Sequence, residues 1–237
     1  MTGRRSALAA VLAMLASVAG AVPAAAQPFK AVPVDEAGED PALEALRDRL
    51  LAAVRRRDVD GVVALAAPDI HLSFGGHHGR EILRQWLDGV DDLPWTGGYY
   101  WQQLQDALAL GGAWQDTGAG RHFCAPYTFV AAYPQDIDPF HVVFIIGTDV
   151  PLHSGPDADD PVVGRLSYDI AAIIDSVPGV PAGDPAAPYW LRIRTADGTA
   201  DGYVRSTDVR SPVDYRACFH RDGETGDWVW DTFIGGD

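Results

Sequence analysis

Four side chains that could carry out acid–base or metal chemistry lie close together in the sequence: Asp69, His71, His77 and His78. Two imidazoles and a carboxylate form a ligand set that zinc accepts, and a histidine such as His71 can act as a general base. However, neighbouring residues of a strand point to opposite faces, and no second ligand set of familiar spacing follows. We therefore interpret these histidines as solvated loop residues and expect no metal ion and no other cofactor. Asp69 and His71 remain the catalytic candidates of an alternative function.

The two cysteines, Cys124 and Cys218, are the remaining candidates for covalent chemistry. His122 lies two residues before Cys124, but a catalytic Cys–His pair is normally assembled by the fold, so the local sequence decides little. Neither a G-x-S-x-G nor an H-E-x-x-H motif occurs in the sequence. In an oxidising compartment two such cysteines form a disulfide, and the alternative is a pair of buried free thiols. The sequence thus favours a non-catalytic protein over an enzyme without deciding the question.

The N-terminal residues are typical of a secretory signal peptide. Arg4 and Arg5 precede an apolar run at 7–22, and small residues follow it as far as Gln27. The alternative is a membrane anchor, but about 16 apolar residues are fewer than the roughly 20 that span a bilayer. We expect cleavage after residues 1–26, a periplasmic or secreted protein with no membrane span, and a mobile leader over 27–41.

Composition excludes several classes of partner. The chain of 237 residues has 33 acidic and 18 basic side chains, a formal net charge of −15. Such a charge gives no basis for nucleic-acid binding or for attraction to an anionic membrane. The apolar fraction of 47 % predicts a folded core rather than disorder.

Apolar periodicity predicts the elements of a first domain over 42–140. Leu43, Leu46, Leu50 and Val54 recur at helical spacing, and alternation over 70–74 predicts a strand. A second short helix that carries Val62, Val63 and Leu65 is predicted to begin at Asp58 or Asp60 and to end before Pro68. Further helices are predicted at 80–87 and 100–110, and a strand near 127–131.

The segment RRRDVDGVVALAAPDIHLSFGG followed by GREILRQWL, within residues 45–88, resembles the opening of SnoaL/ketosteroid-isomerase-like cone folds. The resemblance implies an α+β domain with a small-molecule pocket. The cone fold would continue into long curved strands, whereas residues 100–110 read as a helix. A pocket or an enzyme of the hydrolase or isomerase type, using Asp69 and His71, is therefore the alternative function.

From His141 the chain changes to short β-rich runs separated by Gly, Asp and Pro. DVPLHSGPDADDPVVGRLSYD and WLRIRTADGTADGYVRSTDV resemble bacterial Src-homology-3-type domains over 142–210, although His153 replaces the usual Arg and residues 178–188 form an insertion. The resemblance implies a small all-β barrel over 141–211. Its aromatic groove would contain Tyr168, Trp190 and Tyr203 and would recognise a cell-wall peptide or an extended segment of a periplasmic protein.

Residues 212–237 read as a β-hairpin with a DGETGD turn. An isolated hairpin is marginal in water, so we expect it to return to the first domain, where a Cys124–Cys218 bond would hold it. The predicted fold is α+β, with a helical first domain, an inserted Src-homology-3-like barrel and this C-terminal hairpin. The predicted function is non-catalytic binding; the ligand and the oligomeric state stay open.

Overall fold

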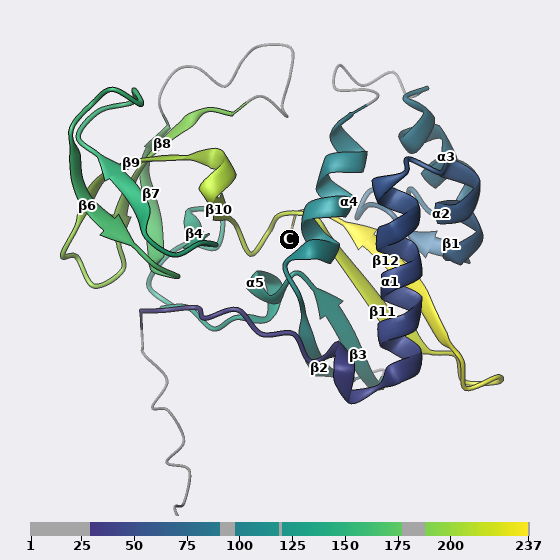
Figure 1. Ribbon diagram of the computed structural model, residues 1–237. Helices are drawn as coiled ribbons and strands as arrows, with labels where there is room; N and C mark the ends of the chain where they lie inside the picture. Colours follow the sequence, from purple (N-terminus) through teal and green to yellow (C-terminus); the bar gives the residue numbers. More distant parts are fainter. Residues whose placement is uncertain (1–28, 91–97, 119, 177–187, 237) are drawn as a thin grey trace, which may run out of the picture.

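The computed structural model describes residues 29–90, 98–118, 120–176 and 188–236. In these ranges the chain forms a five-stranded sheet covered by helices and a separate seven-stranded sheet (Figure 1). The predicted α+β class is confirmed.

The five-stranded sheet has the strand order β1-β12-β11-β3-β2, in which the last two strands of the chain lie between strands from its first half. Only β1 and β12 pair in parallel; the other neighbours are antiparallel. The strands are β1 (Ala66–His71), β2 (Ala113–Thr117), β3 (Gly120–Ala125), β11 (Arg216–Arg221) and β12 (Trp228–Ile234). The C-terminal hairpin is therefore the centre of this sheet.

Helices cover one face of the sheet, and their apolar spacing follows the sequence pattern. Asp40 caps the N-terminus of the helix at Pro41–Arg55, because its carboxylate accepts hydrogen bonds from the N–H groups of Ala42 and Leu43. Leu50 and Leu104 of the helices share one core with Phe219 and Trp230 of the sheet. The elements are η1 (Ala37–Glu39), α1 (Pro41–Arg55), α2 (Val59–Leu65), α3 (Arg80–Asp88), α4 (Tyr99–Ala109) and the short α5 (Tyr127–Val130).

The strand predicted near 127–131 is wrong, since the structure has α5 there. Pro126 has no N–H to donate to a strand ladder and stands directly before the helix, after the end of β3.

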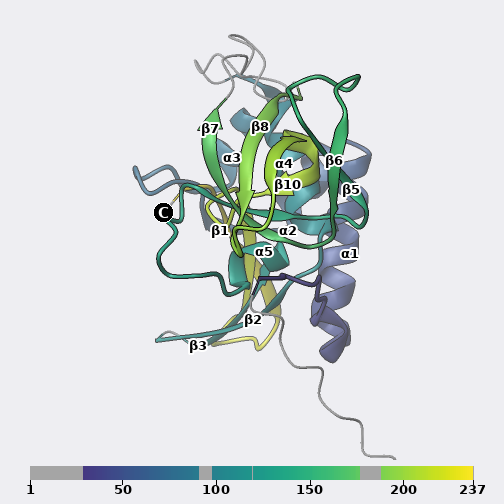
Figure 2. The same ribbon diagram turned by 90° about the vertical axis from the view of Figure 1, so that its left-hand side faces the viewer.

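The seven-stranded sheet has the order β10-β4-β7-β8-β9-β5-β6. It lies beside the first sheet in Figure 1 and in front of it in Figure 2, and the two sheets share no strand. Its own core contains Leu152, Ile193 and Val204. The elements are β4 (Val142–Ile145), β5 (Val150–His153), β6 (Val162–Leu166), β7 (Ile170–Ser176), β8 (Trp190–Thr195), β9 (Asp201–Arg205), η2 (Ser206–Asp208) and β10 (Val209–Arg210).

The structure does not show the closed barrel predicted for this region. Among the described residues no pairing joins β10 to β6, so the sheet is open at both strands. β10 has two residues and pairs only with β4, while Val162 and Val163 of β6 are exposed. The two valines of the PVVG segment are therefore not interior residues, although a closed barrel would bury part of this segment.

The segment expected to be a mobile leader makes defined contacts from residue 29 onward. The N–H of Ile170 donates to the carbonyl of Phe29, and Lys30 forms an ion pair of 2.7 Å with Asp169. At its other end, the N–H of Glu36 donates to the carbonyl of Gly112. This segment thus connects the seven-stranded sheet to the helical part, a role that its composition does not reveal.

Two sequence predictions lie outside the described residues: the signal peptide at 1–26 and almost all of the insertion at 178–188. In the part of the chain that the structure describes, no helix has the length and apolar character required to cross a bilayer.

Candidate functional site

A disulfide joins β11, the central strand of the five-stranded sheet, to its neighbour β3. Cys124 of β3 and Cys218 of β11 are directly opposite each other, with Cα atoms 4.2 Å apart and sulfur atoms 2.10 Å apart. The predicted pairing of the cysteines is confirmed. It ties the C-terminal strand to a strand 94 residues earlier in the chain.

The disulfide and two histidines lie on the same face of the sheet. Phe123 and Phe219 are fully buried in the core beneath the helices, so the residues before and after them point to the opposite face. His122 and His220 each lie two residues from their cysteine on antiparallel strands and are therefore cross-strand neighbours. Their ring centroids are 5.7 Å apart.

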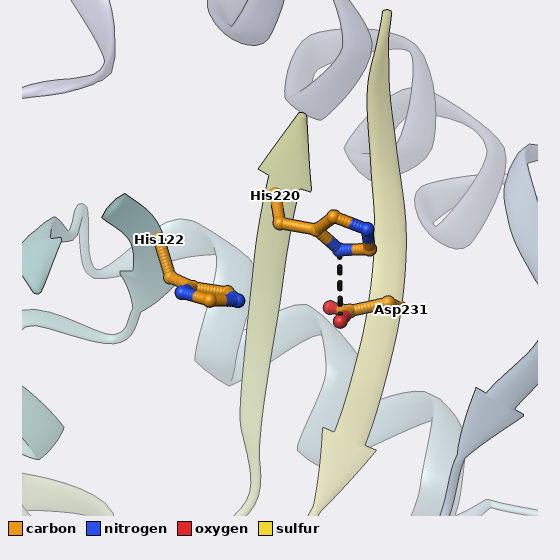
Figure 3. Close-up of side chains that lie close together, drawn as sticks. All are labelled: His122, His220 and Asp231. Atoms are coloured by element: carbon orange, nitrogen blue, oxygen red, sulfur yellow. Dashed lines mark ion pairs between the residues drawn. The ribbon is translucent and has the colours of Figure 1, made fainter. Parts of the chain in front are cut away.

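A β-bulge brings Asp231 to this pair. Cys218 pairs with Thr232 whereas Phe219 pairs with Trp230, which leaves Asp231 as the extra residue of β12. Such a residue redirects a side chain relative to the regular strand. Oδ2 of Asp231 lies 2.9 Å from Nδ1 of His220, and His122 lies beside them (Figure 3).

The three side chains offer a compact set of donor atoms. One ligand atom from each of His122, His220 and Asp231 lies within 4.8 Å of the other two. Nδ1 of His122 lies 3.1 Å from the carbonyl oxygen of Gly120, a contact that places the proton on Nδ1 and leaves the lone pair on Nε2. Oδ1 of Asp231 is buried and has no hydrogen-bond partner.

The cluster is accessible to a small ion. The His220 side chain is 34 % exposed and that of Asp231 is 23 % exposed. The arrangement is chemically that of two imidazoles and one carboxylate, which is a zinc ligand set that leaves a fourth position open. It is also a histidine–carboxylate pair, which can position a base.

A hollow of ≈ 380 Å³ lies at the same end of the sheet. Its wall includes Trp114 and Trp228, with the guanidinium of Arg121 4.1 Å from the first ring and that of Arg221 4.9 Å from the second. Burial raises the pKa of Asp40 in this wall, but hydrogen bonds, the largest from Trp228 and Arg221, outweigh burial and hold that pKa below its ordinary value. Trp114 pairs with Phe123, so its ring lies on the face of the sheet opposite the imidazoles, although His122 and His220 also line the hollow.

The sequence-predicted catalytic pair lies elsewhere. Asp69 and His71 are exposed residues of β1, and His71 forms an isolated bridge with His78. In the described ranges neither belongs to the group of ligand atoms within 4.8 Å of one another.

Two of the three predicted groove residues come together. Trp190 and Tyr203 alternate with the buried residues of β8 and β9, so both lie on the outer face of the seven-stranded sheet. Each pairs across the strands with an arginine, Trp190 with Arg205 and Tyr203 with Arg192. Tyr168 lies just before β7, and the first residues of β7 pair with the C-terminal half of β8. Trp190 is the first residue of β8, so Tyr168 lies at the opposite end of that strand.

Sequence reasoning missed His122, His220 and Asp231 as a set. One signal was present: the tripeptide His-Phe-Cys at 122–124 reads in reverse as Cys-Phe-His at 218–220. Once the cysteines are paired across antiparallel strands, this symmetry places both histidines on one face. No comparable signal indicates Asp231.

Comparisons with known proteins assign no family. No family model and no curated protein matches the sequence. Among solved structures, an NTF2-like protein of unknown function from Pseudomonas putida KT2440 is similar over 86 % of this chain and 89 % of that chain, with 11 % sequence identity and a TM-score of 0.25. At that TM-score the likeness does not assign a fold.

Proposed function

We propose that this chain is an exported binding protein that holds a divalent transition-metal ion between His122, His220 and Asp231. The observation that supports the proposal is the convergence of three donor atoms within 4.8 Å from three separate strands. The buried Oδ1 of Asp231 adds to it, because a buried carboxylate oxygen without a partner is costly and a bound cation would satisfy it.

The ligand types favour zinc over the alkaline-earth ions. Imidazole nitrogen suits Zn²⁺, Cu²⁺ and Ni²⁺, whereas Ca²⁺ and Mg²⁺ prefer sets made of oxygen ligands. The contact of His122 with the Gly120 carbonyl is the kind of outer contact that orients a zinc-ligating histidine. The site would supply three protein ligands and leave one position for water or a further ligand.

Isothermal titration of the purified, oxidised protein with ZnCl₂ tests the proposal. We expect one equivalent of Zn²⁺ to bind, and the variants His122→Gln and Asp231→Asn to bind it at least about tenfold more weakly, because changes even to outer-shell partners cost about 10–100-fold. His71→Gln and His141→Gln remove exposed histidines outside the cluster and are the matched controls.

Circular dichroism of each variant separates loss of the site from loss of the fold. The proposal is wrong if the folded wild type takes up no Zn²⁺, Cu²⁺ or Ni²⁺, or if the control variants lose as much affinity as the cluster variants.

A second candidate function is the recognition of an extended peptide by the seven-stranded sheet, as the Src-homology-3-type resemblance implies. Trp190 and Tyr203 lie on one outer face beside arginines, which is an arrangement that can receive a peptide with acidic groups. Pull-down with purified peptidoglycan and with soluble muropeptides tests the cell-wall form of this function. Equal retention of wild type and a Trp190→Ala, Tyr203→Ala variant would exclude it.

A further inference from the structure

A second cavity lies between the helical part and the seven-stranded sheet, away from the metal cluster. It has a volume of ≈ 410 Å³, within the range of small-molecule sites. One wall is α4, and the other is formed by the residues around η2 and β10, next to α4 in Figure 1. We call it the α4–β10 cleft.

A buried arginine of this cleft has incomplete hydrogen bonding. The Arg210 side chain is only 6 % exposed, and its Nη2 donates to the carbonyl of Tyr215 at 2.7 Å. Its Nε is buried and has no hydrogen-bond partner. A buried guanidinium N–H without an acceptor is costly, so Arg210 keeps an unsatisfied donor beside the two carboxylates with which it forms ion pairs.

Two carboxylates face this guanidinium at distances too long for hydrogen bonds. Oδ2 of Asp214 lies 3.6 Å from Nε, and Oδ2 of Asp106 lies 3.8 Å from Nη1. Each carboxylate also accepts a hydrogen bond from a neighbour in the sequence: Asp214 from the N–H of Ser211, and Asp106 from the side-chain amide of Gln102. The donor and acceptors are thus fixed but not in direct contact.

The charges in the cleft disfavour ionic ligands of either sign. An anion attracted by Arg210 would meet Asp106 and Asp214, and a cation attracted by the carboxylates would meet Arg210. Burial raises the pKa of Asp106, and burial followed by the charge of Asp214 raises the pKa of Tyr189, whose phenol therefore stays neutral.

A hydroxyl group satisfies both partners at once. It accepts a hydrogen bond from a guanidinium N–H and donates one to a carboxylate, and an oxygen beside Nη1 of Arg210 and Oδ2 of Asp106, which are 3.8 Å apart, can reach both. Gln103, Ser206 and Thr207 add further groups that both donate and accept, and the Tyr189 ring offers an apolar surface. A compound with several neighbouring hydroxyls uses all of these features.

We propose that the α4–β10 cleft binds an uncharged carbohydrate, with Arg210, Asp106 and Asp214 recognising its hydroxyls and Tyr189 packing on its ring. This site is independent of the metal cluster, which lies on the outer face of the five-stranded sheet.

Saturation-transfer NMR on the full-length protein tests it with glucose, galactose, mannose, N-acetylglucosamine and their β1,4-linked dimers, and with acetate and putrescine as the charged probes. We expect transfer to at least one sugar. Binding should weaken about tenfold or more in Asp106→Asn, because a hydrogen bond to a charged group is worth more than one between neutral groups, and about two- to tenfold in Gln103→Ala, whose amide is neutral. Asp48→Asn, an exposed carboxylate on α1 outside the cleft, is the control and should bind as the wild type does.

Arg210 is buried and its substitution would disturb the fold, so the test uses Asp106→Asn and Gln103→Ala, which change half-buried residues of α4. Three outcomes overturn the proposal. The first is that no sugar shows saturation transfer at millimolar concentration. The second is that the transfer is unchanged in Asp106→Asn and Gln103→Ala, and the third is that only acetate or putrescine binds. The first means that solvent fills the cleft, and the last means that it is an ion site.

Discussion

His122 and His220 are cross-strand neighbours held by the disulfide two residues away, with their ring centroids 5.7 Å apart. The disulfide fixes the register of β3 against β11, and the register in turn fixes which residues of the two strands face each other. Stability of the C-terminal hairpin and geometry of the proposed metal site therefore depend on the same bond.

Removing the disulfide should lower both stability and metal affinity. The bond closes a separation of 94 residues, and loss of a native disulfide costs about 2–5 kcal/mol of unfolding free energy. We expect Cys124→Ser, Cys218→Ser to show that loss in urea unfolding and to bind Zn²⁺ more weakly under conditions where it is still folded. Unchanged Zn²⁺ affinity in the folded variant would show that β-sheet pairing alone positions the histidines.

The metal cluster shows where prediction from this sequence ends. The sequence left a Cys124–Cys218 disulfide and two free thiols as alternatives, and once the cysteines are paired the neighbouring His122 and His220 could have been predicted to face each other. Asp231 could not, because it reaches His220 only through the bulge in β12, and a bulge depends on how two strands fit rather than on local composition.

A comparable limit applies to the fold. The periodic helices over 41–55, 59–65 and 80–88 were predictable because each has an apolar face that must be buried. The open edges of the seven-stranded sheet were not, because the short motifs that resemble Src-homology-3-type domains define strands and turns but not whether the first and last strands meet.

Lys30 should contribute to stability although it lies near the N-terminus. Its ammonium group pairs with Asp169 at 2.7 Å and donates to the carbonyl of Ser167 at 3.0 Å, and the Asp169 side chain is 13 % exposed. Lys30→Met keeps the aliphatic stem but leaves that carboxylate without its cation, so we expect a loss of about 1–3 kcal/mol in urea unfolding. Arg49→Met changes an exposed residue of α1 and is the control. An equal loss of stability in this variant would show that the ion pair of Lys30 makes no particular contribution.

Gly202 should not tolerate even alanine. A Cβ at this position of β9 would lie 2.6 Å from the carbonyl oxygen of His153 and 2.8 Å from Cγ of Leu152. Strand β5 packs too closely for a side chain, which explains the glycine of the GYV motif. We expect Gly202→Ala to cost about 1–3 kcal/mol by thermal or urea unfolding. Gly223→Ala, which meets no atom within 4 Å, should cost less than half as much; similar losses would contradict the packing argument.

Tyr127 should make stability fall in alkaline solution. Burial, followed by the nearby Tyr168, raises the pKa of Tyr127 from 10.0 to about 12. The phenol of the unfolded chain ionises at lower pH than that of the folded protein. The free energy of unfolding is therefore unaffected by this group below pH 10 and decreases as the pH rises through about 12.

The Tyr127 hydroxyl is buried without a hydrogen-bond partner, so Tyr127→Phe should leave the free energy of unfolding at pH 7 unchanged or raise it by about 1 kcal/mol. Urea unfolding of both proteins between pH 9 and pH 12 gives the decisive difference, because the other tyrosines are common to both. As the pH rises from 10.0 to about 12, the free energy of unfolding of the wild type should fall relative to that of Tyr127→Phe. Parallel curves would show that Tyr127 ionises in the folded protein as it does in the unfolded chain.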